Sequence, residues 1–303
     1  MLDKRNGSEG GNSNSHASRE REAHMQLMTA FATRHSFSRP SERPPHASPL
    51  NVITIDPHAV TAVDLFPLTP LFCSLSVHEW NVPTLYDRAN SRARGGMNED
   101  VPSPRMLSGG AQHFKLLRYL AQQLTASNLV VELGTRTGTS AAALSGCDGS
   151  VSSPVCGAHR VVSIDLNMDG LLDNAVMCGV DLETLLSALP NVDFRAVDIF
   201  SNSTEAADAR ALLLQADIVF VDTAHLGDFE ADVYTFLHDH GFRGLLLLDD
   251  IHWTSNPAME VLWQTVITHP NKLDLTSIGH SSGTGAVNFG GRLELLPFEV
   301  ERV

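Results

Sequence analysis

The stretch LVVELGTRTGTSAAAL, residues 129–144, decides the fold. A hydrophobic, β-branched run leads directly into a turn with glycines at 134 and 138, and alanine-rich, helix-forming sequence follows. Strand, glycine turn and helix in this order predict the first βα unit of a parallel sheet, with a ligand held at the turn. Which ligand suits this turn depends on the residues around it.

Four more short hydrophobic runs alternate with helical sequence further along the chain. Continuous hydrophobicity is typical of strands buried on both faces, and the alternation implies right-handed crossovers. The predicted strands are 128–133, 160–165, 192–198, 216–222 and 244–250. We therefore predict an α/β fold with a doubly wound, mostly parallel, Rossmann-like sheet. The segments 272–279 and 283–291 are expected to add a C-terminal antiparallel strand pair.

The predicted α/β domain spans residues 109–303 and opens with an amphipathic helix over 111–124. Residues 1–50 are rich in Ser, Asn, Arg, His and Pro without periodicity, which predicts a disordered tail. Residues 51–108 begin with a short candidate strand, NVITI, and continue with many breakers. This segment is expected to form either a lid over the site or an extension without a chemical role.

The composition excludes several classes of partner. The chain has 303 residues, of which 43% are hydrophobic, and carries 21 Lys and Arg against 35 Asp and Glu. This acidic balance argues against a nucleic-acid partner. The most apolar stretch is short and interrupted by prolines, so no membrane span is expected. The polar start does not resemble a signal peptide, which leaves a cytoplasmic location as the default.

The four cysteines form no CxxC pair, which argues against a zinc ribbon or a thioredoxin-like motif. Cys147 and Cys156 flank a short loop that is able to close as a disulfide in an oxidising compartment. In the cytosol, reduced cysteines are the rule. The sequence alone leaves both states open.

Acidic residues end four of the five predicted strands, and the strand 128–133 carries Glu132 at its penultimate position. Ligands of open parallel sheets bind beyond the carboxyl ends of the strands, so these acids are expected to share one edge. Clustered carboxylates repel each other unless a ligand or a cation compensates them. The acids are Glu132, Asp165, Asp198, Asp222, Asp249 and Asp250.

The glycine turn itself disfavours a dinucleotide. Arg136 stands where a dinucleotide-binding turn has the glycine that lets the backbone approach a pyrophosphate. Glu132, just before the turn, opposes a polyanion but suits a ligand with an ammonium group. S-adenosylmethionine has that ammonium, a ribose diol and an adenine, and it carries no phosphate.

The sequence resembles the class I S-adenosylmethionine-dependent methyltransferases over about residues 110–290. The matching motifs are VVELGTRTGTS, VVSIDLN, FRAVDI and the long stretch ADIVFVDTAHLGDFEADVYTFLHDHGFRGLLLLDDIHW. The segment GHSSGTGAVNFGG resembles the reversed β-hairpin that closes the family's sheet. Within the class, the pattern is similar to the small-molecule O-methyltransferase branch, which includes catechol-type and cephalosporin-hydroxylase-like proteins.

The resemblance implies a role for each motif residue in cofactor binding. Gly134, Thr135 and Gly138 would form the loop under the cofactor, and Glu132 would lie near its ammonium group. Asp165 would accept hydrogen bonds from the ribose hydroxyls, although it stands 31 residues after Gly134, beyond the roughly 20 usual in dinucleotide-binding folds. Asp198 would lie near the adenine edge, with a helix cap or turn as the alternative.

The resemblance also implies a metal site and a base. Asp222, Asp249 and Asp250 stand where catechol-type enzymes hold a divalent cation such as Mg²⁺. The family commonly has Asp-Asn where this chain has Asp-Asp, which leaves the identity of the metal open. His225 would be the general base, with Asp222 beside it, unless it only caps or packs at the next helix. His252 is a second, weaker candidate.

We therefore predict an enzyme, an S-adenosylmethionine-dependent methyltransferase that methylates a hydroxyl of a small molecule. A homodimer is compatible with this prediction. One alternative is an NAD-dependent oxidoreductase, and another is a non-catalytic binding protein that retains the fold. An iron oxygenase ranks lower, because no H-x-D motif occurs near the strand ends.

Overall fold

The computed structural model describes residues 51–68, 70–72, 111–254, 257–280 and 282–296. The predicted tail at 1–50 and the whole of 73–108, the larger part of the segment 51–108, lie outside these residues. All of the described residues belong to one unit, Ser48–Val303, so residues 51–72 form part of the same unit as the α/β domain.

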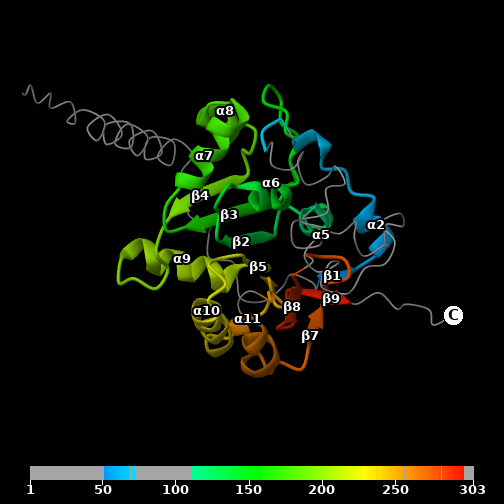
Figure 1. Cartoon of the computed structure of the whole chain (residues 1–303), viewed down its shortest axis with the longest axis vertical. Helices are drawn as coiled ribbons and strands as arrows, with labels where there is room; N and C mark the ends of the chain where they lie inside the picture. Colours follow the sequence, from blue (N-terminus) through cyan, green and yellow to red (C-terminus); the bar gives the residue numbers. More distant parts are fainter. Residues whose placement is uncertain (1–50, 69, 73–110, 255–256, 281, 297–303) are drawn as a thin grey trace, which may run out of the picture. The chain divides into compact units, whose positions relative to one another are not determined.

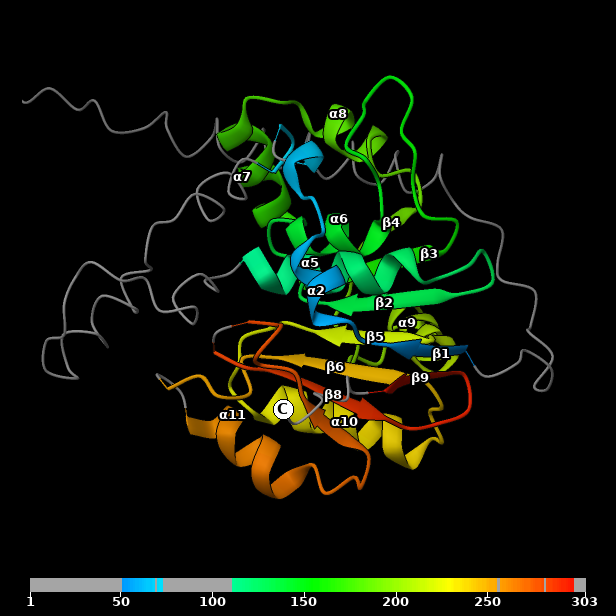
Figure 2. The same ribbon diagram turned by 90° about the vertical axis from the view of Figure 1, so that its right-hand side faces the viewer.

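The central element is a seven-stranded sheet with the order β4-β3-β2-β5-β6-β8-β7. Figure 2 shows β2, β5, β6 and β8 following one another through the molecule. The first five strands are parallel, whereas β8 runs antiparallel to both β6 and β7. The strands are β2 (Leu129–Leu133), β3 (Arg160–Asp165), β4 (Val192–Ala196), β5 (Ile218–Val221), β6 (Leu245–Asp249), β7 (Lys272–Asp274) and β8 (Thr284–Asn288).

This topology confirms the predicted doubly wound sheet and its reversed C-terminal pair. The order turns at β2, which pairs with β3 on one side and with β5 on the other. Such a reversal leaves a crevice beyond the carboxyl ends of the two inner strands, because the connecting helices leave in opposite directions. The edge of the sheet where β2, β3 and β5 end is therefore the place where a ligand is expected.

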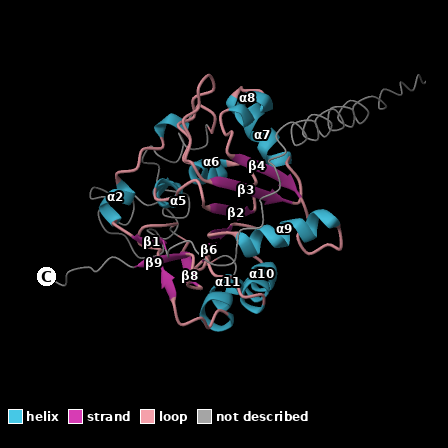
Figure 3. Ribbon diagram, turned by 180° about the vertical axis from the view of Figure 1, so that it is seen from behind, coloured by secondary structure: helices cyan, strands magenta, loops and turns pink. Residues whose placement is uncertain are grey.

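Helices cover both faces of the sheet (Figures 1 and 3). On one face, apolar side chains of α9, α10 and α11 pack with inward residues of five strands in a single core cluster. The other side holds α5 and α6, which pack against each other. The helices are α5 (Ala111–Gln122), α6 (Thr139–Ser145), α7 (Asp169–Cys178), α8 (Leu182–Ser187), α9 (Thr204–Gln215), α10 (Asp228–Asp239) and α11 (Pro257–Val261).

The segment after α11 differs from a simple helix. The predicted helix near 256–269 divides into α11 and a π-helical turn, η3 (Leu262–Val266). The wider turn carries Trp263 into the core, where it is buried. Within the described residues, no helix has the length and apolar character that a membrane crossing requires.

Residues 51–72 pack firmly against the domain. The predicted strand is β1 (Asn51–Thr54), which pairs in parallel with β9 (Leu293–Leu296), a strand that the sequence did not suggest. It is followed by α2 (Pro57–Thr61) and a 3-10 turn, η1 (Phe66–Leu68). The Tyr119 hydroxyl donates to the Thr54 carbonyl, 2.9 Å away, and Asn174 donates to the Leu71 carbonyl, also at 2.9 Å. The part of the candidate lid that is described is thus tied to α5 and α7.

The insertion after α6 is closed by a disulfide. Cys147 and Cys156 are bonded across the loop 148–155, so the oxidised alternative is the one present. Asp148 Oδ1 accepts hydrogen bonds from the amides of Ser150 and Val155, which fixes the loop from within. Cys178, at the end of α7, is also disulfide-bonded.

Candidate functional site

A cavity of about 740 Å³ opens beyond the carboxyl ends of β2, β3, β4 and β5. Its walls combine apolar side chains with four carboxylates and one guanidinium. This places an adenosine-sized hollow at the switch point of the sheet. The residues lining it include Leu133, Gly134, Arg136, Ile164, Asp165, Val197, Asp198, Ile199, Phe200, Asp222, Thr223, His225, Asp228 and Phe229.

The glycine turn forms the floor of this cavity. Gly134 has φ +100°, and a Cβ atom there would stand 1.8 Å from the carbonyl oxygen of Asp222. Gly138 caps α6 at φ +79°, where a Cβ would meet Leu171 at 2.6 Å. Thr135 is buried and hydrogen-bonded to Ser163 Oγ at 2.6 Å, so it fixes the turn to β3 and does not line the cavity.

Asp165 presents its carboxylate to the cavity from the end of β3. Oδ2 accepts a hydrogen bond of 2.8 Å from the Arg136 amide, and Oδ1 accepts one of 2.7 Å from the Leu166 amide. These bonds hold the carboxylate in one orientation and leave further lone pairs for a ligand. Asp198 also lines the cavity, and its Oδ1 accepts from the Phe200 amide at 3.0 Å in a local turn.

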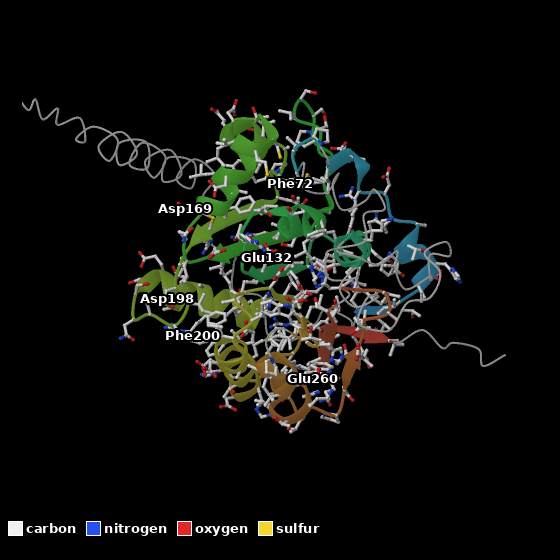
Figure 4. All side chains as sticks on the ribbon, viewed as in Figure 1. Phe72, Glu132, Asp169, Asp198, Phe200 and Glu260 are labelled. Carbon is white, nitrogen blue, oxygen red and sulfur yellow. A yellow bond between two sulfur atoms is a disulfide. The ribbon has the colours of Figure 1, made fainter. Side chains whose placement is uncertain are left out.

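Glu132 lies beneath the cavity and does not line it. Its side chain is fully buried and accepts a hydrogen bond from Ser163. Burial raises the pKa of Glu132 to about 8, so the carboxyl is mostly neutral at pH 7. Figure 4 shows Glu132 in the interior among the strands, with Asp198 and Phe200 further out. The predicted contact with an ammonium group stays a prediction, and this burial favours a structural role.

The three aspartates of the predicted metal site come together beside the cavity. His225 Nε2 lies 3.2 Å from Asp222 Oδ1 and 3.5 Å from Asp250 Oδ2. Asp249 belongs to two groups of side chains. Within each group, the ligand atoms all lie within 4.8 Å of one another. One group is His113, Asp222 and Asp249, and the other is His225, Asp249 and Asp250.

Two histidines that sequence reasoning did not select join these acids. His113 comes from the first turn of α5, and its Nδ1 lies 3.5 Å from Asp249 Oδ1. His280, from the loop between β7 and β8, places Nδ1 2.8 Å from Asp250 Oδ1 and 3.5 Å from Asp249 Oδ1. Asp250 also accepts a hydrogen bond from Ser282. We call the set His113, Asp222, His225, Asp249, Asp250 and His280 the His–Asp cluster.

The iron-oxygenase alternative ranked low because no local H-x-D motif occurs. In the structure, histidines and carboxylates come together without such a motif, because the histidines reach the carboxylates from separate elements. No signal linked His113 or His280 to the strand-end acids, since each is a single histidine among 14. Only the tertiary fold assembles them.

Electrostatics divide the cluster into neutral and charged members. Burial lowers the pKa of His113 to about 4, and burial with the neighbouring charge of Asp222 raises that of Asp249 well above its ordinary value. Burial alone would lower the pKa of His280, but the hydrogen bond to Asp250 and the charge of Asp249 raise it to about 9. For Asp250, burial acts to raise the pKa, yet hydrogen bonds from His280 and Ser282 bring it below its ordinary value.

The pKa of His225 results from the same opposing effects as the pKa of His280. Burial acts to lower its pKa, but its hydrogen bond to Asp222 and the charge of Asp250 bring the net value above the ordinary one. An imidazole in this setting holds its proton more tightly than a free imidazole and must lose it before acting as a base. The role of His225 as general base stays a prediction, and this arrangement favours its protonated form.

Backbone conformation marks the same edge of the sheet. Among the described residues, the non-glycine positions with positive φ are Arg136, His225 and Asp250, at +44°, +55° and +58°. Such conformations cost free energy and concentrate at functional sites. The His225 loop is held by the buried side chain of Glu230, which accepts hydrogen bonds from the His225 amide at 3.0 Å and the Gly227 amide at 2.9 Å.

His252 belongs to a different group of side chains. Nδ1 lies 2.5 Å from Glu260 Oε2, and Nε2 lies 2.8 Å from Asp274 Oδ2. Both ring nitrogens are thus occupied, and His252 is absent from the cavity wall. The arrangement gives His252 no access to a ligand in the cavity, so the base is better sought at His225.

The comparisons with known proteins add a likeness of fold. No family model matches the sequence, and no curated protein matches it. Solved structures with a similar fold include the SAH-bound methyltransferase PaMTH1 of Podospora anserina, at 15% identity and TM-score 0.38, over 72% of this chain and 94% of that one. Cofactor-bound Rv0187 from MTB follows at 17% and 0.40, over 73% and 98%.

A third similar structure is the O-methyltransferase from Bacillus cereus in complex with SAH, at 17% identity and TM-score 0.37, over 74% of this chain and all of that one. At such low identities and TM-scores, these likenesses carry no argument about function. The fold assignment rests on the strand order and the reversed C-terminal strands.

Proposed function

We propose that this chain is an S-adenosylmethionine-dependent methyltransferase that methylates a hydroxyl group of a small molecule. One observation carries the proposal: an acid-lined cavity of nucleoside size lies at the switch point of the sheet, with Asp165 fixed at its rim. Four carboxylates against one guanidinium favour a ligand with positive charge. S-adenosylmethionine carries a sulfonium and an ammonium group.

The cofactor would occupy the cavity between the ends of β2, β3 and β4. Asp165 would accept hydrogen bonds from the two ribose hydroxyls, a task for which a carboxylate with free lone pairs is suited. The adenine would lie between the apolar walls near Ile199 and Phe200, with Asp198 at its edge. Gly134 lets the turn pass close to the backbone of Asp222, beside the space that the methionyl part would occupy.

The chain's own share in methyl transfer is positioning and proton removal. The acceptor hydroxyl must attack the methyl carbon in line with the sulfur, so much of the acceleration comes from holding the partners in place. His225 Nε2, which faces Asp222 and lines the cavity, would take the hydroxyl proton once its own proton has left. Glu230 would keep His225 in position through the loop amides.

A divalent cation fits the residues present. Asp249 groups with Asp222 and His113 on one side and with Asp250 and His225 on the other, and its Oδ1 is buried without a hydrogen-bond partner among the described residues. The ion would be held within these two groups, to which the predicted ligands Asp222, Asp249 and Asp250 all belong. When bound, the ion would offset the repulsion between these carboxylates and lower the pKa of the acceptor hydroxyl.

Calorimetric titration of the full chain tests the proposal. We expect saturable binding of S-adenosylmethionine and of S-adenosylhomocysteine, weak or absent binding of NAD, and methyl transfer to at least one member of a panel of phenols, sugars and hydroxy acids. Binding of NAD without binding of S-adenosylmethionine would favour the oxidoreductase alternative, although the acidic wall opposes a pyrophosphate.

Variants distinguish an enzyme from a binding protein that retains the fold. Asp222→Asn and His225→Gln are expected to lower the turnover number by about 100-fold, the range typical of general acid–base groups. Cofactor affinity should change far less in His225→Gln, because His225 acts on the acceptor. If both variants keep the methylation rate of the parent protein, the assigned catalytic roles are wrong.

A further inference from the structure

The His–Asp cluster draws its members from four separate parts of the chain. His113 lies on α5, Asp222 and His225 follow β5, and His280 precedes β8, while Asp249 and Asp250 end β6. Fold stability does not explain why three carboxylates and three imidazoles should meet here, because burying charged groups costs free energy. A bound ligand that accepts electron pairs from all of them would explain it.

Buried atoms without partners point to such a ligand. The side chain of His113 is only 3% exposed, and neither ring nitrogen has a hydrogen-bond partner among the described residues. Asp249 is 4% exposed, and its Oδ1 also has no hydrogen-bond partner among the described residues. The 3.5 Å between His113 Nδ1 and Asp249 Oδ1 exceeds the usual length of a hydrogen bond. Buried polar atoms are nearly always satisfied, so partners for these three atoms are missing.

The donor set differs from the one that Mg²⁺ selects. Mg²⁺ takes oxygen ligands in near-ideal octahedral geometry and usually keeps several waters. Imidazole nitrogen favours Zn²⁺, Fe²⁺, Co²⁺ or Ni²⁺, and carboxylates are compatible with these ions. In the group His113, Asp222 and Asp249, one imidazole and two carboxylates place their ligand atoms within 4.8 Å of one another, a spacing that one ion can bridge.

We propose that the His–Asp cluster binds a divalent first-row transition-metal ion through His113, Asp222 and Asp249, in preference to Mg²⁺. His225 and Asp250 stand beside this triple as the adjoining group. The inference concerns the cation of the proposed methyltransferase, and it replaces the expected Mg²⁺ with an ion that accepts a nitrogen ligand.

Protons are the competing explanation. Protonated His225 and His280 would offset part of the charge of the three carboxylates without any metal. That explanation leaves His113 unaccounted for, because its nitrogens face neither a water-exposed surface nor a hydrogen-bond partner in the described part of the chain. The two explanations predict opposite results when metal is added.

The His252 group offers a matched control within the same protein. His252 also contacts two carboxylates, Glu260 and Asp274, but both its nitrogens are occupied and the site is partly exposed. A histidine between two acids is therefore present at each location. Of these two groups, the His–Asp cluster is the one in which His113 and Asp249 have buried atoms without a hydrogen-bond partner among the described residues.

The test uses the full chain, freed of metal with a chelator and titrated with Co²⁺. We expect a visible d–d absorption band that saturates at one ion per chain, and calorimetry should give tighter binding of Co²⁺ than of Mn²⁺, with Mg²⁺ weaker still. His113→Gln and Asp249→Asn should each weaken Co²⁺ binding by at least about tenfold. His252→Gln should leave it within about twofold.

Circular dichroism and S-adenosylmethionine titration of each variant show whether the fold survives. If His113→Gln folds and binds Co²⁺ like the parent protein, if His252→Gln removes the band, or if Mg²⁺ competes on equal terms, the inference is overturned. Cofactor binding without transition-metal binding would refute this inference alone. Metal binding without cofactor binding would instead refute the proposed function.

Discussion

Gly134 and Asp222 touch across the ends of two neighbouring strands. The backbone of β2 passes so close to that of β5 that a Cβ atom on Gly134 would stand 1.8 Å from the carbonyl oxygen of Asp222. The obstacle is backbone and cannot rotate away. The glycine turn and Asp222 of the His–Asp cluster are therefore fixed to one another, and a change at the turn should disturb both.

Three Gly→Ala variants test this contact. Gly134→Ala should lower the free energy of unfolding by more than about 3 kcal/mol, since it combines a backbone clash with a positive φ. Gly138→Ala should cost less, because the Leu171 side chain it meets can move. Gly179→Ala has φ +69° but open space, so only the backbone penalty of about 1–2 kcal/mol is expected. Urea denaturation gives the ranking, and equal losses at the three sites would contradict the steric argument.

Asp165 should determine cofactor affinity. Asp165→Asn keeps the shape of the side chain but removes the charge that accepts the ribose hydroxyls. We expect the Kd for S-adenosylmethionine to rise by about 10- to 100-fold, the effect of losing one or two hydrogen bonds to a charged group. Asp193→Asn is the matched control, because Asp193 lies on β4 but pairs with Arg160 and Arg195, away from the cavity wall. A similar loss in both variants would point to general destabilisation of the sheet.

The strand ends could be predicted because their signal is local. Each hydrophobic run and the acid that closes it lie within about seven residues, and parallel strands bring their carboxyl ends to one edge. Asp165, Asp198, Asp222 and the Asp249–Asp250 pair do lie at that edge, as their positions in the sequence predict. The antiparallel pair of β7 and β8 followed from the glycine-containing turn between them.

Contacts between distant segments carried no comparable signal. His113 reaches Asp249 only because α5 packs over the sheet, and His280 arrives from the last hairpin. The pairing of β1 with β9 joins the two ends of the described chain in the same way. Glu132 shows a subtler limit: its position next to the turn suggested a ligand contact, but the alternation of side chains in β2 directs it into the interior.

Glu132 makes stability depend on pH. In the folded chain the pKa of Glu132 is about 8, whereas its ordinary value is 4.5. At a pH between these two values, the folded chain keeps the proton on Glu132 and the unfolded chain has lost it. The free energy of unfolding should therefore fall as pH rises from about 5 to 8, by up to about 1.4 kcal/mol per pH unit from this group. Glu132→Gln lacks this contribution, so its stability relative to the parent protein should rise over that range.

Urea denaturation at pH 5, 6, 7 and 8 measures the difference between the two proteins. Parallel curves would mean that Glu132 is ionised in the folded chain. The same variant also tests the predicted contact with the cofactor's ammonium group. If Glu132 is structural and neutral, Glu132→Gln should bind S-adenosylmethionine within about threefold of the parent, whereas a loss of tenfold or more would restore the ligand role.

The Cys147–Cys156 disulfide should contribute measurably to the free energy of unfolding. Its presence in the native protein should also indicate whether the chain resides in an oxidising compartment. It closes a loop with a sequence separation of 9, for which loop-closure entropy gives about 2–3 kcal/mol. The Cys147→Ser/Cys156→Ser double variant should lose about that much free energy of unfolding. Thiol titration of the denatured, unreduced chain should find at most one reactive thiol, because three of the 4 cysteines, Cys147, Cys156 and Cys178, are disulfide-bonded. Full thiol reactivity in protein from the native compartment would instead match the cytoplasmic prediction, since disulfides persist mainly in oxidising environments.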